Sequence, residues 1–334
     1  MTKSFNDAIG GYFELETQTR ADWPASCQGL LLNSARNAFR VILEARRPKR
    51  VLIPRYLCHS MLQPLQETKT PFETYEINCR LFPAEPLEPS ANELAVIANY
   101  FGLRSGLDYA QDVSKGPRFV IDNSQAFFSL PNTLAFSIYS PRKFVGVPDG
   151  GVLHGPGAFD SYLSGQSQSI ERFGHLLGRA EFGPEKYYEA CKSAERSLAA
   201  EPPRPMSKLT RKLLASIDFA QAAKTRCANF DLLHSALREF NVLDADLDQG
   251  AVPMVYPFLP KEPGLRDHLI SHKIYVAKYW PNTVAAISSG SFEHELLQRL
   301  APLPIDQRYG PAEMARITET VKAWLSGQSG EQDA

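Results

Sequence analysis

The chain has 334 residues, of which 43% are hydrophobic, and its formal net charge is −1. This length exceeds one small domain and predicts one large domain or two coupled domains with a sizeable core. Lysines and arginines are scattered along the chain, which argues against a nucleic-acid partner. No apolar run reaches the length of a membrane span, and the first residues lack the pattern of a signal peptide, so we expect no membrane partner.

The cysteines favour a reducing compartment. Five cysteines are spread along the chain without a CxxC pair, at positions 27, 58, 79, 191 and 227. An odd, unclustered set is typical of free thiols and not of a disulfide framework or a zinc site. We therefore expect a cytoplasmic protein with no metal site.

The first two hundred residues alternate between two patterns. Short apolar runs predict buried strands at 29–33, 50–53, 94–100, 118–122 and 134–139. Between some of them lies helical spacing, as in residues 35–47, where apolar side chains recur every three or four positions. The alternation predicts an α/β fold with a mostly parallel sheet covered by helices, and ligands then bind beyond the carboxyl ends of the strands.

The pattern changes near the proline-rich segment 201–205. A long helical stretch over 206–240, a strand over 252–258 and further helical patterns follow. We therefore predict a larger domain over residues 1–205 and a smaller α+β domain over residues 206–334.

The first candidate site residue stands where the strand 29–33 runs into a helix. Ser34 is a natural helix N-cap, and the free backbone N–H groups after it favour an anion. Taken alone, the motif is better explained by an ordinary capped helix.

The second candidate is Asp122, which ends the apolar strand 118–122. An unpaired carboxylate is costly to bury, whereas a cationic partner such as a protonated ring nitrogen would keep it ionised. A turn-forming role after the strand is the alternative.

The third candidate is Lys143, just after the strand 134–139. Glycines at 146, 150 and 151 let the backbone come close to a ligand, and a partly desolvated amine can attack a carbonyl group. A solvated surface lysine is the ordinary alternative. A fourth cluster, Tyr100 and Phe101 at the end of the strand 94–100, contains either substrate contacts or core aromatics.

These features occur in the order that one cofactor requires. Pyridoxal phosphate (PLP) needs a phosphate anchor, a carboxylate against its pyridine nitrogen and an amine for its aldehyde. The carboxylate keeps the ring protonated, and the lysine also serves as the general base and acid. The sequence therefore predicts Asp122 and Lys143 as catalytic residues.

The residues around these positions resemble the DegT/DnrJ/EryC1/StrS family of sugar aminotransferases, which have the type I, aspartate-aminotransferase-like PLP fold. The resemblance covers roughly residues 10–320. The chain is most similar to a shorter branch of the family. The family's phosphate turn matches Ser34, Ala35 and Arg36, although its glycine and threonine are replaced. Its Glu-Asp-Ala-Ala-Gln-Ala motif matches 121–126, and its Gly-Glu-Gly-Gly motif matches 148–151.

The resemblance implies a role for each matching residue. Asp122 would bind the pyridine nitrogen, Gln125 would lie near the ring hydroxyl, Ser137 would hold the phosphate, and Lys143 would attach the cofactor. Ser137 stands one residue further from the lysine than in most members. The segment 54–59 is similar to the stretch that leads to the ring-stacking residue, which leaves Tyr56, Cys58 and His59 as candidates.

The C-terminal region adds two substrate candidates. Trp280 would line the substrate pocket, and Arg308 would bind the carboxylate of an amino donor. The alternatives are a core aromatic for Trp280 and a buried salt bridge for Arg308. The family's histidine-glycine loop and asparagine-tyrosine-arginine segment have no clear match.

The resemblance implies an aminotransferase that moves an amino group from glutamate or a similar donor to a keto acceptor, a nucleotide-linked keto sugar for surface polysaccharide. It also implies a homodimer with sites at the interface. A PLP-dependent dehydratase, a transferase for a non-sugar acceptor, and a non-catalytic binding or regulatory protein are the alternatives.

Overall fold

The computed structural model describes residues 14–20, 22–105, 117–281 and 287–329. Its centre is a seven-stranded sheet with the strand order β1-β7-β6-β5-β4-β2-β3. Strand β7 is antiparallel to its neighbours β1 and β6, and all other neighbouring pairs are parallel. The predicted mostly parallel sheet is therefore confirmed. The strands are β1 (Leu30–Leu32), β2 (Arg50–Pro54), β3 (Phe72–Tyr75), β4 (Glu93–Ala98), β5 (Phe119–Asn123), β6 (Phe136–Tyr139) and β7 (Gly151–His154).

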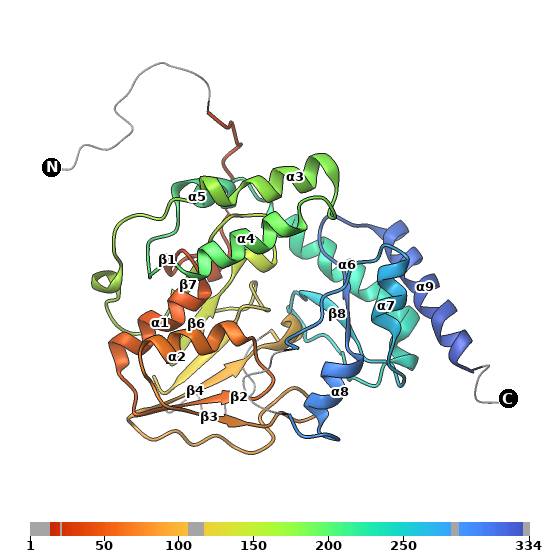
Figure 1. Cartoon of the computed structure of the whole chain (residues 1–334), viewed down its shortest axis with the longest axis horizontal. Helices are drawn as coiled ribbons and strands as arrows, with labels where there is room; N and C mark the ends of the chain where they lie inside the picture. The colour runs from red at the N-terminus through yellow and green to blue at the C-terminus, as the bar shows by residue number, and fades with distance from the viewer. Residues whose placement is uncertain (1–13, 21, 106–116, 282–286, 330–334) are drawn as a thin grey trace.

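Nine α-helices surround the strands in the described part of the chain, and Figure 1 shows their arrangement. None of the helices described is long and apolar enough to cross a membrane. Their bounds are α1 (Ala35–Arg46), α2 (Leu62–Glu67), α3 (Gly174–Phe182), α4 (Tyr188–Ala199), α5 (Lys208–Ala215), α6 (Phe219–Leu237), α7 (Leu265–Ser271), α8 (Phe292–Arg299) and α9 (Pro311–Ser329).

Helix α1 forms where its sequence pattern predicts it. The Ser34 hydroxyl caps the N-terminus by accepting a hydrogen bond from the Asn37 N–H at 3.1 Å. The helix ends at Arg46, and its C-cap residue Arg47 has a left-handed φ of 44°. Its apolar residues share a buried cluster with Phe136 and Ile138 of β6, so α1 covers this face of the sheet.

The opposite face is covered near β6 and β7 by the chain that follows residue 205. Tyr139 and Val152 lie in a second buried cluster with Leu214 of α5 and Phe219 of α6. Because side chains alternate across a strand, Tyr139 and Ile138 belong to different faces. Both faces of the sheet are therefore packed in this region.

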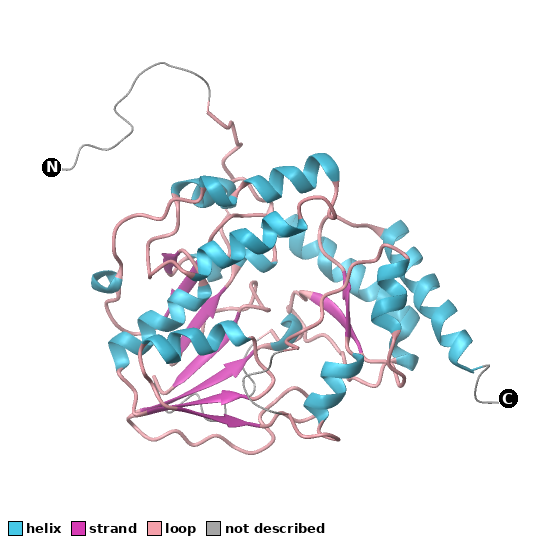
Figure 2. Cartoon of the chain, in the orientation of Figure 1, coloured by secondary structure: helices cyan, strands magenta, loops and turns pink. Residues whose placement is uncertain are grey.

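A second sheet contains β8 (Val255–Phe258) and β9 (Ala301–Pro304), which pair antiparallel. Figure 2 shows these two strands apart from the large sheet, with helices on their outer side, and Figure 1 labels α6, α7 and α9 there. The second sheet lies within the predicted small domain. The domain boundary at residue 205 stays a prediction.

The strands bring several loops to one edge of the large sheet. Because β2, β4, β5 and β6 are parallel, their carboxyl ends share an edge, and the antiparallel β7 starts there. Strand β1 is antiparallel to β7, with Leu32 opposite Gly151, so β1 ends at this edge as well. The segments after β1, β5 and β6 and the turn before β7 therefore meet.

Gly151 allows this meeting at very short range. A Cβ atom at this position would lie 2.1 Å from the Ser34 carbonyl carbon and 2.3 Å from the Ala35 nitrogen. The neighbouring Gly150 N–H donates to the Asn33 carbonyl at 2.7 Å. The start of β7 thus packs directly on the backbone turn that leads into α1.

Asp149 joins the same turn to α5. This carboxylate is fully buried and accepts hydrogen bonds from the Ser207 N–H at 3.1 Å, the Ser207 hydroxyl at 2.8 Å and the Ser167 hydroxyl at 3.0 Å, and also from the Thr210 hydroxyl. Ser207 is at the same time the N-cap of α5. Four donors from the described residues thus satisfy this buried carboxylate.

Three strands were not predicted from the sequence. Strand β3 is a short strand at the sheet edge whose first two side chains are exposed, β7 follows two glycines, and β9 contains two prolines in four residues. The predicted helical stretch 206–240 is interrupted by residues 216–218, where α5 ends and the Asp218 side chain caps α6.

Replacing Gly151 with alanine tests the close approach of β7 to the turn before α1. We expect Gly151→Ala to lower the free energy of unfolding by about 3 kcal/mol, because rigid backbone atoms would have to move. Chemical denaturation measures the change. Gly327→Ala is the control, because Gly327 lies on the exposed side of α9 and a Cβ there would meet no atom within 4 Å, and it should be neutral or slightly stabilising. Equal stability of Gly151→Ala and the wild type would contradict the expected contact.

Candidate active site

The site lies at the shared edge of the large sheet. Asp122 is near the end of β5, opposite Ile138 of β6, and Lys143 ends the short 3₁₀ helix η5 (Pro141–Lys143) that follows β6. Ser34 precedes α1 and forms a bridge with Gly150. The structure therefore brings the predicted phosphate turn, the strand-end aspartate and the lysine turn to one edge.

The turn before α1 offers donors for an anion. The first N–H groups of a helix have no acceptor within the helix, and the helix dipole favours negative charge at this end. Ser34 and Ala35 are buried, whereas the Arg36 side chain is half-buried. The Arg36 Nε atom is buried and has no hydrogen-bond partner among the described residues. Burial, as the largest cause, and the nearby Arg142 guanidinium lower the pKa of Arg36, whereas Cys58 and Glu195 act against this.

Asp122 is buried, with 8% of its surface exposed. Its Oδ1 atom accepts a hydrogen bond from the Ser124 N–H at 2.9 Å. Within the described part of the chain, no basic side chain forms an ion pair with it. A buried carboxylate with so few donors contrasts with Asp149 and suits a cationic ligand group.

Gln125 has one satisfied and one unsatisfied group. Its Oε1 atom accepts from the Phe101 N–H at 2.9 Å, while its Nε2 atom is buried without a partner among the residues described. Gly102 makes this contact possible, because it has a φ of +71° and a Cβ there would lie 2.8 Å from the Gln125 carbonyl oxygen. The unsatisfied amide is a donor held in place for a ligand acceptor.

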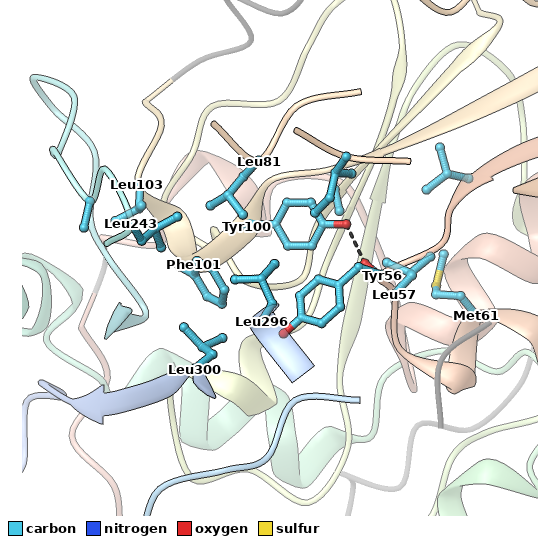
Figure 3. Close-up of a cluster of buried hydrophobic side chains, with 14 of the residues drawn as sticks. Tyr56, Leu57, Met61, Leu81, Tyr100, Phe101, Leu103, Leu243, Leu296 and Leu300 are labelled. Atoms are coloured by element: carbon cyan, nitrogen blue, oxygen red, sulfur yellow. Dashed lines mark hydrogen bonds between the residues drawn. The ribbon is translucent and has the colours of Figure 1, made fainter. Parts of the chain in front are cut away.

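Aromatic residues form one wall next to Asp122. The Tyr100 hydroxyl donates to the Tyr56 carbonyl at 2.5 Å, drawn as a dashed line in Figure 3. Burial is the main reason that the pKa of Tyr100 lies well above its usual value, and the Asp122 charge contributes. In Figure 3 the Tyr56 hydroxyl points away from Tyr100 towards Leu296, and it has no partner among the described residues.

Trp280 completes this wall. Its ring centroid lies 4.8 Å from that of Tyr56 and 6.1 Å from that of Tyr100. Phe101 is fully buried and stacks with Tyr279 at 6.1 Å. Tyr100, Phe101 and Trp280 thus lie together beside the site, and their contact with a substrate stays a prediction.

Lys143 opens onto a cavity of about 900 Å³. Its side chain is exposed on the cavity wall. Arg308 lines the same cavity and forms a bidentate pair with Asp306, at 2.6 and 2.9 Å, in which the arginine is the more exposed partner. Arg308 therefore forms the expected salt bridge on the wall that Lys143 shares, and its contact with an amino donor stays a prediction.

Sequence reasoning missed Arg226, which fixes the backbone next to Lys143. This arginine of α6 is 2% exposed and donates to the Phe144 carbonyl at 3.1 Å and the Met254 carbonyl at 3.0 Å. Gln307 accepts from the Arg226 Nε at 2.9 Å and itself donates to the Phe144 carbonyl at 2.8 Å. Burial lowers the pKa of Arg226 to about 10. Nothing in the local sequence marks Arg226, because its partners are distant along the chain.

Ser137 is not brought to the phosphate turn. Its side chain is fully buried and accepts from the Asn132 N–H at 3.1 Å. It also points to the sheet face opposite α1, because Phe136 and Ile138 on either side of it pack with α1. Ser140, buried just after β6, is the serine at the shared edge. The extra residue between Ser137 and Lys143 was the sequence signal that Ser137 departs from the family pattern.

The ring-stacking candidates Tyr56, Cys58 and His59 lie beyond the end of β2, and Tyr56 is fully buried. Cys58 is half-buried, and its charge acts to raise the pKa of Arg36 against the effect of burial. Its sulfur accepts a hydrogen bond from the Ser60 hydroxyl at 3.1 Å. His59 is exposed at the start of the 3₁₀ helix η2 (His59–Met61). Cys58 is thus the candidate whose charge acts on Arg36 of the phosphate turn, and the stacking role of Tyr56, Cys58 or His59 stays a prediction.

The residues at this edge fit pyridoxal phosphate. The α1 turn with Arg36 supplies anion donors, Asp122 supplies a buried carboxylate, and the Gln125 amide supplies an unsatisfied donor. Lys143 supplies the amine at the same edge. In the described part of the chain, no group of three or more His, Cys, Asp or Glu residues could hold a metal ion.

Solved structures share this fold. An aminotransferase of the DegT/DnrJ/EryC1/StrS type from Brucella abortus is 14% identical, with 88% of this chain and 85% of that chain covered and a TM-score of 0.59. DesV of S. venezuelae, solved in complex with a ketimine intermediate, is 15% identical, with coverage of 90% and 86% and a TM-score of 0.62. The sugar aminotransferase CalS13 from Micromonospora echinospora is 14% identical, with coverage of 88% and 86% and a TM-score of 0.62.

These similarities confirm the predicted aspartate-aminotransferase-like fold over most of the chain. No protein-family model matches the sequence, and no curated protein matches it. At 14–15% identity, the likeness to solved structures concerns the fold.

Replacing Arg226 tests its role in holding the lysine turn. We expect Arg226→Leu to lower the free energy of unfolding by about 3 kcal/mol, because it removes the guanidinium donor from the buried Met254 carbonyl and leaves the Phe144 carbonyl with Gln307 alone. Thermal and chemical denaturation measure the loss. Arg238→Leu, at an exposed arginine just after the same helix, should change stability by less than about 0.5 kcal/mol. Similar small effects for both variants would show that the buried hydrogen bonds contribute little.

Proposed function

We propose that this protein is a PLP-dependent aminotransferase. The observation that carries the proposal is the meeting of four groups at one sheet edge: the α1 turn, buried Asp122, the unsatisfied Gln125 amide and Lys143. The fold similarity to proteins described as aminotransferases supports it. Each group meets one chemical requirement of this cofactor.

In the proposed reaction the bound cofactor supplies an electron sink for the bond broken at the substrate carbon. Asp122 would hold the ring nitrogen protonated through its charge, and Gln125 would donate to the ring hydroxyl. The N–H groups after Ser34, the Arg36 guanidinium and the Ser140 hydroxyl would bind the phosphate. The Lys143 Nζ would attach the cofactor and then move a proton at the substrate carbon.

We propose glutamate or a similar amino acid as the donor and a nucleotide-linked keto sugar as the acceptor, for surface polysaccharide biosynthesis. The neighbours described as sugar aminotransferases support this acceptor. A cytoplasmic homodimer with the site at the interface, and a division into residues 1–205 and 206–334, belong to the same proposal. A dehydratase, a non-sugar transferase and a non-catalytic binding protein are the alternatives.

An absorption spectrum with added PLP tests the proposal. We expect the wild-type protein to give a visible band of lysine-bound cofactor that bleaches when glutamate is added. Lys143→Ala should lose the band and transamination, because the amine that attaches the cofactor is removed. The matched control is Lys212→Ala, since Lys212 pairs with Glu14 at the surface.

The other outcomes separate the alternatives. A band that ignores every amino donor would indicate a dehydratase or another PLP reaction. A band that bleaches with glutamate in a protein that aminates no keto-sugar nucleotide would indicate a non-sugar acceptor. A wild-type protein without a band would favour the non-catalytic protein, and wild-type transamination by Lys143→Ala would refute the assignment of the lysine.

Replacing Asp122 tests the pairing with the ring nitrogen. We expect Asp122→Asn to keep a cofactor band but to slow the reaction with the amino donor by about a hundredfold or more, because an amide does not hold the ring protonated. Stopped-flow absorbance measures the rate. Asp160→Asn, at an exposed residue of the short helix Asp160–Tyr162, is the control and should react like the wild type. An unchanged rate in Asp122→Asn would remove Asp122 from the mechanism.

A further inference from the structure

The cavity beside Lys143 is larger and more basic than the attachment of one cofactor requires. Its volume of about 900 Å³ lies at the upper end of small-molecule sites, which span roughly 300–1,000 Å³. Among the described residues that line it, the basic side chains are Arg142, Lys143, Arg179, Arg226 and Arg308, and the acidic side chain is Asp306. This balance favours a negatively charged occupant.

Three of these basic side chains already have partners. Arg142 pairs with Glu195 of α4, and Arg308 pairs with Asp306. Arg226 donates to backbone carbonyls and to Gln307. Within the described part of the chain, Lys143 and Arg179 are the lining cations whose side chains have no acceptor.

Helix α3 carries Arg179 towards the cavity. Leu176, Arg179 and Ala180 line the cavity from this helix, and their spacing of three and four residues places them on one helix face. On the other side Gly178 packs on Tyr187, since a Cβ there would lie 2.3 Å from the Tyr187 ring. This contact fixes which face of α3 is turned to the cavity.

The end of the α3 segment is held on the far side of the cavity. The Tyr275 hydroxyl, on the cavity wall, donates to the carboxylate of Glu185, just after α3. Helix α4 is tied to the lysine turn by the pair between Glu195 and Arg142. Arg179 therefore sits on a segment that is anchored at both sides of the cavity.

We propose that Arg179 binds an anionic group, a phosphate or a carboxylate, at the end of a substrate whose other end reacts at Lys143. A guanidinium binds either group through two parallel hydrogen bonds. The inference rests on the proposed function for the reacting end of the substrate. The anion site itself does not depend on the cofactor.

The test is isothermal titration of the full-length protein with inorganic pyrophosphate and with glutarate, with and without saturating PLP. We expect Arg179→Gln to weaken the binding of at least one probe about tenfold or more in the presence of PLP, through the loss of charged hydrogen bonds. The matched control is Arg196→Gln, because Arg196 is exposed on the neighbouring α4 and does not line the cavity. It should bind both probes like the wild type.

The outcomes separate the sources of the anion. A loss confined to pyrophosphate assigns the site to a phosphate-bearing acceptor, and a loss confined to glutarate assigns it to a dicarboxylate donor. Unchanged affinities in Arg179→Gln, or equal losses in Arg196→Gln, would overturn the proposal. If the wild-type protein forms no cofactor band and Arg179→Gln still weakens anion binding, the proposed function is refuted and the anion site is retained.

Discussion

The contact between Gly151 and the backbone of Ser34 and Ala35 is the constraint on which the site depends. It leaves no room for a side chain, and it fixes the start of β7 against the turn that leads into α1. Because β7 also pairs with β6, the same contact sets the distance between the phosphate turn and the lysine turn. The hydrogen bonds of Asp149 to Ser207 then attach α5 to this junction. One packing requirement thus positions elements that are far apart in the chain.

The two buried aspartates at this edge differ in how many hydrogen-bond donors they have. Asp149 accepts hydrogen bonds from four protein groups and needs nothing more. Among the described residues, Asp122 has one backbone donor and the amide of its neighbour Gln125 has no acceptor. A structural carboxylate is expected to be fully satisfied within the protein, whereas a ligand-binding one keeps capacity for its ligand. The contrast supports a binding role for Asp122 and a structural role for Asp149.

The sequence predicted the parts of the fold and site that depend on local pattern. Ser34, Asp122 and Lys143 were identified because each follows or ends an apolar strand. The parallel pairing of the strands accounts for their meeting at one edge. The short strands β3, β7 and β9 carry too few alternating residues, or too many glycines and prolines, for their pattern to be recognised. Ser137 was assigned through the resemblance to the family motif, although it stands one residue further from the lysine, and its side chain lies on the sheet face opposite α1. Arg226 and Gln307 were not predicted, because the Phe144 carbonyl to which both donate lies 82 and 163 positions away in the sequence.

The bonds of Arg226 also bear on how a molecule can reach Lys143. The guanidinium links the Phe144 carbonyl, next to the lysine, to the Met254 carbonyl at the start of the small sheet. These two walls of the cavity are therefore joined by buried hydrogen bonds. Helix α3, by contrast, touches the opposite wall through the exposed contact between Glu185 and Tyr275. Separating the walls that Arg226 joins would break buried hydrogen bonds, whereas separating the segment after α3 from Tyr275 would break an exposed one.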